Sequence, residues 1–357
     1  MSTGDATPVP PKRRLPAEWE PQGAIQLTWP HDATDWAPVL DQVHPVFATI
    51  AASISQYEPV IIVARDPEHI EEISGFLTET AIRPDRLWFA LASSNDTWAR
   101  DHGAITVFDG NQPRLLDFTF NGWGGKYPAD LDDAITRALA SQGVFGSCVP
   151  EPTGLILEGG SIESDGAGTL LTTTRCLLSS TRNPDLDRTG LEQRLGEWLG
   201  AERILWLEHG QLEGDDTDAH IDTLARFCAR DTIAYVQCDD PQDPHYPELQ
   251  AMEQELRALR QTSGEPYRLI PLPWPAPIVE DGRRLAATYA NFLILNGAVL
   301  LPVYNGPADA VARDRLAGAF PGREIVEIDC RAIIRQGGSL HCLTMQYPAA
   351  ALGIPQE

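Results

Sequence analysis

The sequence is poor in basic residues and contains no long apolar run. Of its 357 residues, 27 are lysine or arginine and 51 are aspartate or glutamate, which gives a formal net charge of −24. This excess disfavours nucleic acid as a partner, because binding to phosphates requires a basic surface. No stretch approaches the roughly 20 consecutive apolar residues of a membrane-spanning helix, so we expect no membrane partner. A small cationic molecule is a partner that this charge would attract.

Closely spaced cysteine pairs are also absent. The six cysteines, at positions 148, 176, 228, 238, 330 and 342, include no Cys-x-x-Cys motif. This spacing disfavours a disulfide framework and a zinc ribbon, and it is typical of a reducing cytoplasm. Residues 1–14 are rich in proline and polar residues and lack the apolar segment of a secretion signal. We therefore predict a cytoplasmic protein with a flexible leader over residues 1–14 and a single domain over residues 15–357.

The rest of the chain repeats one pattern of strands, tight turns and helices. Asp-Gly or Asn-Gly pairs at 109–110, 165–166 and 296–297 predict hairpins, because both turn positions tolerate positive φ. Helices are predicted at 39–54, 131–140, 191–199, 249–259 and 311–320, and inner strands at 60–63, 155–157, 204–206, 269–270 and 325–328. A period of roughly 50 to 70 residues predicts about five strand–helix units around a common axis in one α/β domain. A doubly wound sheet is the alternative, but no Gly-x-Gly-x-x-Gly motif or Walker loop supports it.

Polar residues occupy matching positions in these units, each beside a predicted hairpin or strand. They are Asp96, Glu158, His220, Asp222 and Cys342. If the units surround one axis, these residues meet in one cleft that holds three carboxylates, an imidazole and a thiol. Buried carboxylates require a compensating cation. A guanidinium group fits this requirement, because its forked N–H groups match carboxylate oxygens.

The residue types also suggest roles in a reaction. Cys342 would attack the guanidinium carbon, and His220 would protonate the departing nitrogen and then activate a water molecule. Glu158 would hold His220 in the useful tautomer. Asp96 and Asp222 would bind the nitrogens of the substrate. This scheme requires neither a metal nor any other cofactor.

Each of these residues also has a structural interpretation. A free cysteine is commonly a small buried hydrophobe, and a histidine is commonly a satisfied part of the core. On a strand, Asp218, His220 and Asp222 would lie on one face, which also suits a metal site and a metal-dependent hydrolase. Glu158 and the two glycines that follow it would otherwise form a turn with a carboxylate cap.

The sequence also suggests roles for residues near these candidates. We expect Arg100 and Asp101 to brace their loop as an ion pair. His341 would be structural, because in an extended segment it points away from Cys342. Three tryptophans are expected either to wall a cationic pocket or to pack in the core; they are Trp29, Trp98 and Trp123.

Seven segments together resemble the agmatine deiminase and bacterial peptidyl-arginine deiminase family, within the guanidino-group modifying (pentein) superfamily. They are LPAEWEPQ at 15–22, WPH at 29–31, NDTWARD at 95–101, FNGWGG at 120–125, EGGS at 158–161, DAHID at 218–222 and GGSLHC at 337–342. The resemblance implies a five-bladed αβ-propeller and cofactor-free hydrolysis through an amidino-cysteine intermediate. By position, it implies that Cys342 is the nucleophile, that His220 is the acid and base, and that Glu158 orients His220. Asp96 and Asp222 match the guanidinium-binding pair.

The resemblance leads us to expect a deiminase that converts agmatine and water to N-carbamoylputrescine and ammonia, in polyamine biosynthesis. Asp215, Asp216 and Asp218 are candidates to hold the amine of agmatine. The alternatives are a deiminase of free or peptidyl arginine, and a propeller-shaped binding protein without catalysis. Ser339 and Met345 replace residues that are usual in agmatine deiminases, which leaves the tail of the substrate open. A homodimer is the default assembly.

Overall fold

Runs of branched apolar residues form the inner strands of the computed structural model, which describes residues 13–354. In β3 (Val60–Ala64) and β12 (Thr232–Val236) every residue is buried. This is typical of strands that are covered on both faces. Successive side chains of β3 point to opposite sides. Val60 and Ile62 therefore belong to one apolar cluster, while Ile61 and Val63 belong to another.

Among the described residues, five sheets share one arrangement, in which an antiparallel pair is extended by a parallel strand. In the first sheet, β19 (Thr344–Tyr347) is antiparallel to β2 (Ala24–Thr28), which is parallel to β3, and β4 (Leu87–Leu91) follows β3. The other four sheets are β5 (Ile105–Asp109), β6 (Gln112–Thr119) and β7 (Pro150–Ile156); β8 (Ile162–Ser164), β9 (Thr169–Thr173) and β10 (Arg203–Leu207); β11 (Ala225–Ala229), β12 and β13 (Arg268–Leu272); and β16 (Leu293–Ile294), β17 (Ala298–Val303) and β18 (Glu324–Asp329). The predicted repeat and the mixed α/β class are confirmed.

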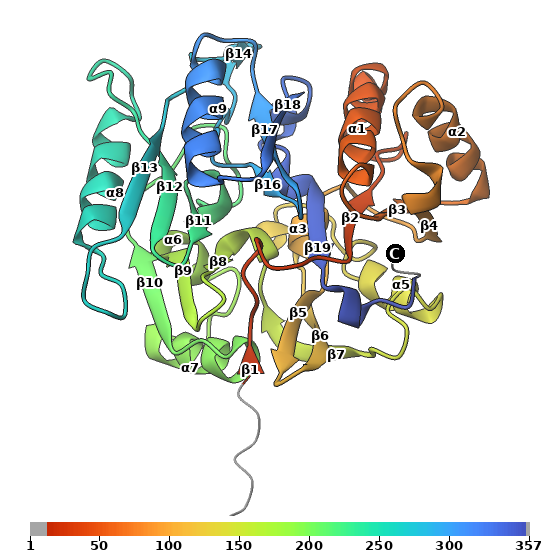
Figure 1. Ribbon diagram of the computed structural model, residues 1–357, viewed down its shortest axis with the longest axis horizontal. Helices are drawn as coiled ribbons and strands as arrows, with labels where there is room; N and C mark the ends of the chain where they lie inside the picture. The colour runs from red at the N-terminus through yellow and green to blue at the C-terminus, as the bar shows by residue number, and fades with distance from the viewer. Residues whose placement is uncertain (1–12, 355–357) are drawn as a thin grey trace, which may run out of the picture.

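Helices lie outside the sheets (Figure 1). They are α1 (Leu40–Ser55), α2 (Pro67–Leu77), α5 (Ile135–Ser141), α7 (Arg188–Leu199), α8 (Tyr246–Ala258) and α9 (Ala308–Ala319). The start of α7 follows from its sequence, because the Asp187 side chain caps the helix by accepting a hydrogen bond from the Gly190 amide. Leu191, Leu195 and Leu199 form its buried face, and Gly200 ends it with a φ of 71°. No helix among residues 13–354 is long and apolar enough to cross a membrane.

The structure differs from the sequence predictions at several boundaries. All five predicted helices are present, but α2, which begins at Pro67 after its cap Asp66, was not predicted. The predicted leader lies outside the described residues up to position 12. Its last two residues, Arg13 and Arg14, form β1 and pair with β5, so the leader boundary at 14 is wrong. The strands β14 (Val279–Glu280) and β15 (Arg283–Arg284) form a separate hairpin that was not predicted either. The single domain stays a prediction.

One feature of the repeat positions the candidate site. In four sheets, a single helical turn directly precedes the first strand. These turns are α3 (Ala99–His102), η3 (Gly159–Ser161), η4 (Ile221–Thr223) and η6 (His341–Leu343). The turn α3 packs against η6 and η3, and η3 packs against η4. Residues that are far apart in the sequence therefore meet near the centre of the molecule.

Candidate active site

Cys342 lies on η6 at a cavity of about 230 Å³. Its side chain is buried, and the Asn291 Nδ2 donates a hydrogen bond to the sulfur at 3.2 Å. The thiol in turn points to Asp222 Oδ2 at 3.5 Å. Burial, together with the charges of Asp222 and Asp101, raises the pKa of the thiol well above its ordinary value. Without a ligand, the sulfur is therefore protonated at neutral pH.

The cavity has an acidic and aromatic lining. Its carboxylates come from Asp35, Asp96, Asp101 and Asp216. Aromatic rings of Trp98, Trp123 and Tyr127 also line it, together with the cationic side chains of Arg283 and Arg335. Four acidic side chains against two guanidinium groups give the cavity an excess of acidic groups, and the aromatic faces add further attraction for a cation.

His220 lies at the start of η4 and is completely buried. Among the described residues, neither ring nitrogen has a hydrogen-bond partner, and Asp101 Oδ1 is 3.6 Å from Nδ1. Burial lowers the pKa of His220 to about 3, so the ring is neutral at physiological pH. A neutral ring with free nitrogens can accept a proton and then return it.

Glu158 is buried beside His220 but has another partner. The Arg182 Nε donates to both of its oxygens, at 2.9 and 3.0 Å. The remaining nitrogens of Arg182 donate to Asp218 Oδ2 and to the Thr217 carbonyl. Glu158 therefore makes no hydrogen bond to His220, and its predicted orienting role would act through charge. The glycines that follow it do more than form a turn, because a Cβ on Gly160 would lie 2.6 Å from His220 Nδ1.

The two predicted guanidinium-binding carboxylates lie at different depths. Asp96 lines the cavity, and its Oδ1 accepts hydrogen bonds from Trp36 Nε1 at 2.9 Å and from the Thr97 amide at 2.8 Å. Burial raises the pKa of Asp96 to about 7. Asp222 is completely buried, and its Oδ1 has no hydrogen-bond partner among the described residues. An unpaired buried carboxylate oxygen is costly unless a ligand satisfies it.

The alternative in which Asp218, His220 and Asp222 lie on one strand does not hold. Asp218 and Ala219 have positive φ values of 69° and 68°, so the backbone turns before η4. As a result, the Asp218 side chain binds Lys126 and Arg182, while Asp222 faces the thiol. The metal site that this strand would have formed is therefore not brought together.

Two other groups of side chains are close enough to hold a metal ion. They are Glu158 with Cys176 and His220, and Glu18 with Glu163 and His341. In the first group, Arg182 occupies both oxygens of the glutamate. In the second, Arg226 binds both glutamates. A cation already neutralises the carboxylates of each group, so neither group fits a metal ion well.

Expectations for three neighbouring residues also require correction. Arg100 and Asp101 do not pair with each other, because α3 directs them to opposite sides. Asp101 faces the cavity and accepts hydrogen bonds from Trp123 Nε1 at 2.9 Å and from the Gly160 amide at 3.0 Å. Arg100 Nη2 instead lies 3.9 Å from Glu18. His341 is buried outside the cavity, but its segment is a helical turn and not the extended strand from which we argued.

Two of the three tryptophans that were considered as walls of a cationic pocket line the cavity. Trp98 and Trp123 line the cavity, whereas Trp29 lies in the apolar core and donates to His44 Nδ1. Of Asp215, Asp216 and Asp218, which were suggested to hold the amine of the substrate, only Asp216 lines the cavity.

Sequence reasoning missed Asn291, Arg182 and Asp101 as site residues. Asn291 could have been found, because it precedes β16 at the position that the other site residues occupy in their own units.

The chain is similar to several known proteins along most of its length. The model of the Porphyromonas-type peptidyl-arginine deiminase family matches residues 14–348. The agmatine deiminases of Stutzerimonas stutzeri and Pseudomonas aeruginosa are each 34% identical to this chain, over 98% of it and 99% of the relative. A solved structure from Porphyromonas gingivalis, provisionally named an arginine deiminase, is 49% identical with a TM-score of 0.89, over 96% of this chain and 100% of that chain. A substrate-bound cysteine-to-serine variant of the C. jejuni agmatine deiminase is 37% identical with a TM-score of 0.87, over 94% of this chain and 96% of that chain.

The glycines before Cys342 yield a first prediction. A Cβ on Gly338 would lie 2.3 Å from Trp98 Cζ3, within a rigid ring, so we expect Gly338→Ala to lower the free energy of unfolding by about 1–3 kcal/mol. The displaced turn should also change the rate at which iodoacetamide alkylates Cys342. Gly318→Ala in α9 is the control, because no atom lies within 4 Å of its Cβ. The prediction would be contradicted if urea unfolding showed Gly338→Ala to be as stable as the wild type.

The raised pKa of Asp96 predicts how cation binding depends on pH. As pH falls through about 7, Asp96 takes up a proton and the cavity loses one negative charge. Guanidinium ion should therefore bind roughly tenfold more weakly at pH 6 than at pH 8. The measurement is the factor by which guanidinium chloride slows alkylation of Cys342 at each pH. Asp96→Asn should remove most of this dependence, and a variant that retained the wild-type profile would exclude Asp96 as the titrating group.

Proposed function

Because the chain belongs to the Porphyromonas-type peptidyl-arginine deiminase family, we propose that it hydrolyses agmatine to N-carbamoylputrescine and ammonia through a covalent intermediate on Cys342. The protein is a hydrolase that acts on C–N bonds of guanidino groups. The observation that carries the proposal is the thiol at a cavity with four carboxylates, next to the unpaired oxygen of Asp222. The agmatine named for the curated relatives supports the choice of substrate.

Binding of the substrate prepares the nucleophile. The guanidinium group enters between the aromatic side chains and binds the carboxylates of Asp96 and Asp222. Its positive charge offsets the negative charges that raise the pKa of Cys342 in the free protein. The thiolate therefore forms when the substrate is bound, because a nearby cation stabilises it. The neutral ring of His220 accepts the proton from the thiol.

Two bond exchanges complete the reaction. The sulfur of Cys342 bonds to the guanidinium carbon, and His220 passes its proton to the departing nitrogen, which leaves as ammonia. An amidino group remains on the sulfur. Water then attacks the same carbon while His220 takes its proton, and the C–S bond breaks to release the ureido product. The proton on His220 returns to the sulfur, which restores the thiol and the neutral ring. The proton that carried the positive charge of the guanidinium group is taken up by the ammonia, which ends as ammonium.

Three charged residues of the cavity, Asp35, Asp216 and Arg283, are here called its mouth. They discriminate between substrates that carry different groups beyond the guanidinium. Asp35 is exposed, and Asp216 accepts a hydrogen bond from the Tyr127 hydroxyl. Both carboxylates line the cavity and would attract the ammonium group of agmatine. Arg283 also lines the mouth, on the β14–β15 hairpin, and would instead attract a carboxylate. This residue, and the name of the P. gingivalis relative, favour arginine as a second candidate substrate.

The architecture that accompanies this chemistry is a five-bladed αβ-propeller. Its support is the common strand order of the five sheets and the packing of the turns that precede their first strands. In this arrangement each blade contributes residues to one end of the axis. The complete set of reactive groups favours an enzyme over the alternative of a propeller-shaped binding protein. A cytoplasmic location, a homodimer, the absence of a cofactor and a role in polyamine biosynthesis stay predictions.

The function is tested with a panel of agmatine, free arginine and arginine peptides. We expect agmatine to yield equal amounts of ammonia and ureido product, and Cys342→Ala to yield neither. Mass spectrometry of the wild-type protein quenched in acid during turnover of agmatine should find the amidino group on Cys342, because water releases that group only in the second step. Turnover of arginine alone would reject agmatine, and turnover of no guanidine would reject the enzyme.

Variants at the mouth test how the tail is recognised. Asp35→Asn and Asp216→Asn should each raise the KM for agmatine about two- to fivefold with little change in kcat, as expected of charges that water screens at least in part. Arg283→Gln removes a positive charge instead of a negative one, and it should leave the KM for agmatine unchanged or lower it. A rise in the KM for arginine in Arg283→Gln would instead support the second candidate.

A further inference from the structure

A chain of buried contacts continues behind Asp222, away from the cavity. The His341 Nδ1 lies 2.8 Å from Asp222 Oδ2, and its Nε2 lies 2.7 Å from Glu18 Oε2. All three side chains are buried, Glu18 with 9% of its surface exposed. The proposed reaction gives no role to His341 or to Glu18. Glu18 belongs to the segment LPAEWEPQ at 15–22, whose purpose the sequence leaves open.

Glu18 is anchored independently of the site. The Arg226 Nη2 donates to its Oε2 at 2.7 Å, and the Ile294 amide donates to its Oε1 at 2.7 Å. Burial alone would raise the pKa of Glu18, but Arg226 and His341 outweigh it and lower that pKa below its ordinary value. The glutamate is therefore an ionised acceptor in a fixed position.

Both ring nitrogens of His341 face carboxylate oxygens, which accept hydrogen bonds and do not donate them when ionised. Burial would raise the pKa of Asp222, but the hydrogen bond and charge of His341 lower it below its ordinary value. With both carboxylates ionised, each nitrogen of the ring must donate. His341 is then held as an imidazolium with one orientation.

This arrangement decides which oxygen of Asp222 is free. The ring of His341 occupies Oδ2, so the carboxylate plane is set and Oδ1 stays unpaired. We propose that His341 and Glu18 are positioning residues that hold Asp222 ionised, with Oδ1 available to the guanidinium group of the substrate. This inference rests on the proposed function, since it assigns the free oxygen to the same substrate.

Other titratable and charged groups surround these residues. Asp222 also faces Cys342, the ring of His220, the Arg226 guanidinium and the Asp101 carboxyl. On its other side, the network of His341 and Glu18 includes Arg226, Arg100 and Glu163. The arginines remain charged at any pH near neutral, so a pH effect of the variants must come from the acidic groups.

The test compares Glu18→Gln and His341→Gln with Glu58→Gln. Glu58 is the matched control, because it is also a buried carboxylate, but its Oε2 accepts from the Asn296 amide, and it does not line the cavity. The readout is protection of Cys342 from iodoacetamide by guanidinium chloride, measured from pH 5 to pH 9. We expect protection in both test variants to be at least tenfold weaker at neutral pH. Its acid limb should also move above the one that Asp96 sets in the wild type, since Asp222 loses the cation that keeps it ionised and then titrates as well.

A purely structural role would give a different result. Lower stability without a shifted acid limb, or the same loss in Glu58→Gln, would overturn the proposal. If the variants do not fold, ¹⁵N NMR of the wild-type protein labelled on histidine decides. At neutral pH both ring nitrogens of one histidine should donate hydrogen bonds, as the contacts of His341 require, and a His341 ring with only one donating nitrogen would overturn the proposal.

These readouts do not require turnover, so they separate this inference from the proposed function. Protection by guanidinium ion with the expected shift would stand even if agmatine and arginine were not hydrolysed. Failure of guanidinium ion to protect the wild type would overturn the inference, even if turnover were observed.

Discussion

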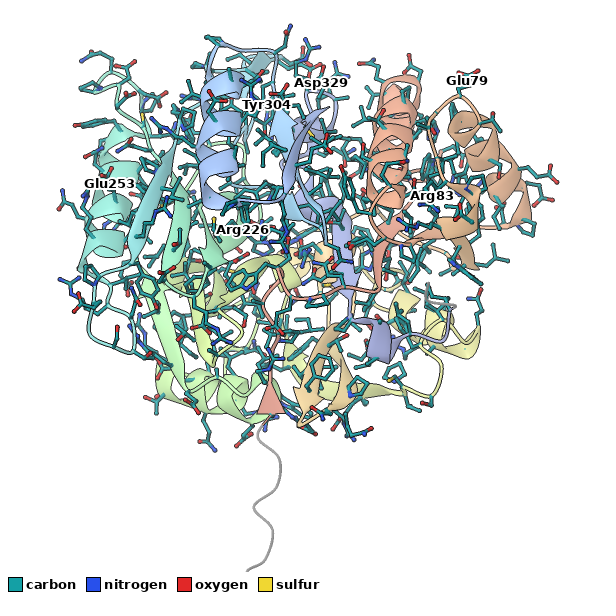
Figure 2. All side chains as sticks on the ribbon, in the orientation of Figure 1. Glu79, Arg83, Arg226, Glu253, Tyr304 and Asp329 are labelled. Atoms are coloured by element: carbon teal, nitrogen blue, oxygen red, sulfur yellow. The ribbon has the colours of Figure 1, made fainter. Side chains whose placement is uncertain are left out.

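Arg226 is completely buried near the centre of the molecule, and its pairing is the constraint on which the site depends (Figure 2). Its guanidinium binds Glu18 from the N-terminal segment and Glu163 from β8, and it donates to the Phe292 carbonyl beside β16. Removing one partner of such a buried pair costs about 3–5 kcal/mol, because the remaining charge is left without compensation. This pairing therefore joins β11, which carries Arg226, to β8, to the residue before β16 and to the N-terminal segment.

From this network the electrostatics of the cavity follow. Glu18 holds His341, His341 holds Asp222, and Asp222 faces the thiol of Cys342. On the other side of His220, Arg182 balances Glu158. At the inner end of the cavity the acidic groups are not fully balanced by cations. Protons therefore remain there on groups such as Cys342 and Asp96, which would otherwise be charged. In the proposed reaction a cationic substrate supplies the missing charge, so recognition of the substrate and activation of the nucleophile would be one event.

The sequence pattern predicted candidate residues that the structure brings together at or beside one cavity, but it predicted their partners less well. Cys342, His220 and Asp96 could be found because they occupy equivalent positions in a repeat, and the repeat is visible in turn signals and apolar strands. Asp101 was assigned to a loop ion pair because its sequence neighbour is Arg100. The short turn α3 separates the two side chains, and the Trp123 and Gly160 partners of Asp101 lie in other parts of the chain. For Glu158, the dominant partner Arg182 lies beyond a complete hairpin, where no local pattern marks it.

The sequence by itself determined the sign of the charge, the alternation of helices and strands, and the identity of the thiol and imidazole. These properties depend on composition, on the apolar period and on residues within one turn or hairpin, all of which can be read locally. Only the tertiary structure decided which oxygen of Asp222 is free, which carboxylates hold protons, and which aspartates reach the cavity. Those properties depend on burial and on charges brought from distant units, because hydrogen bonds and electrostatic forces act between neighbours in space.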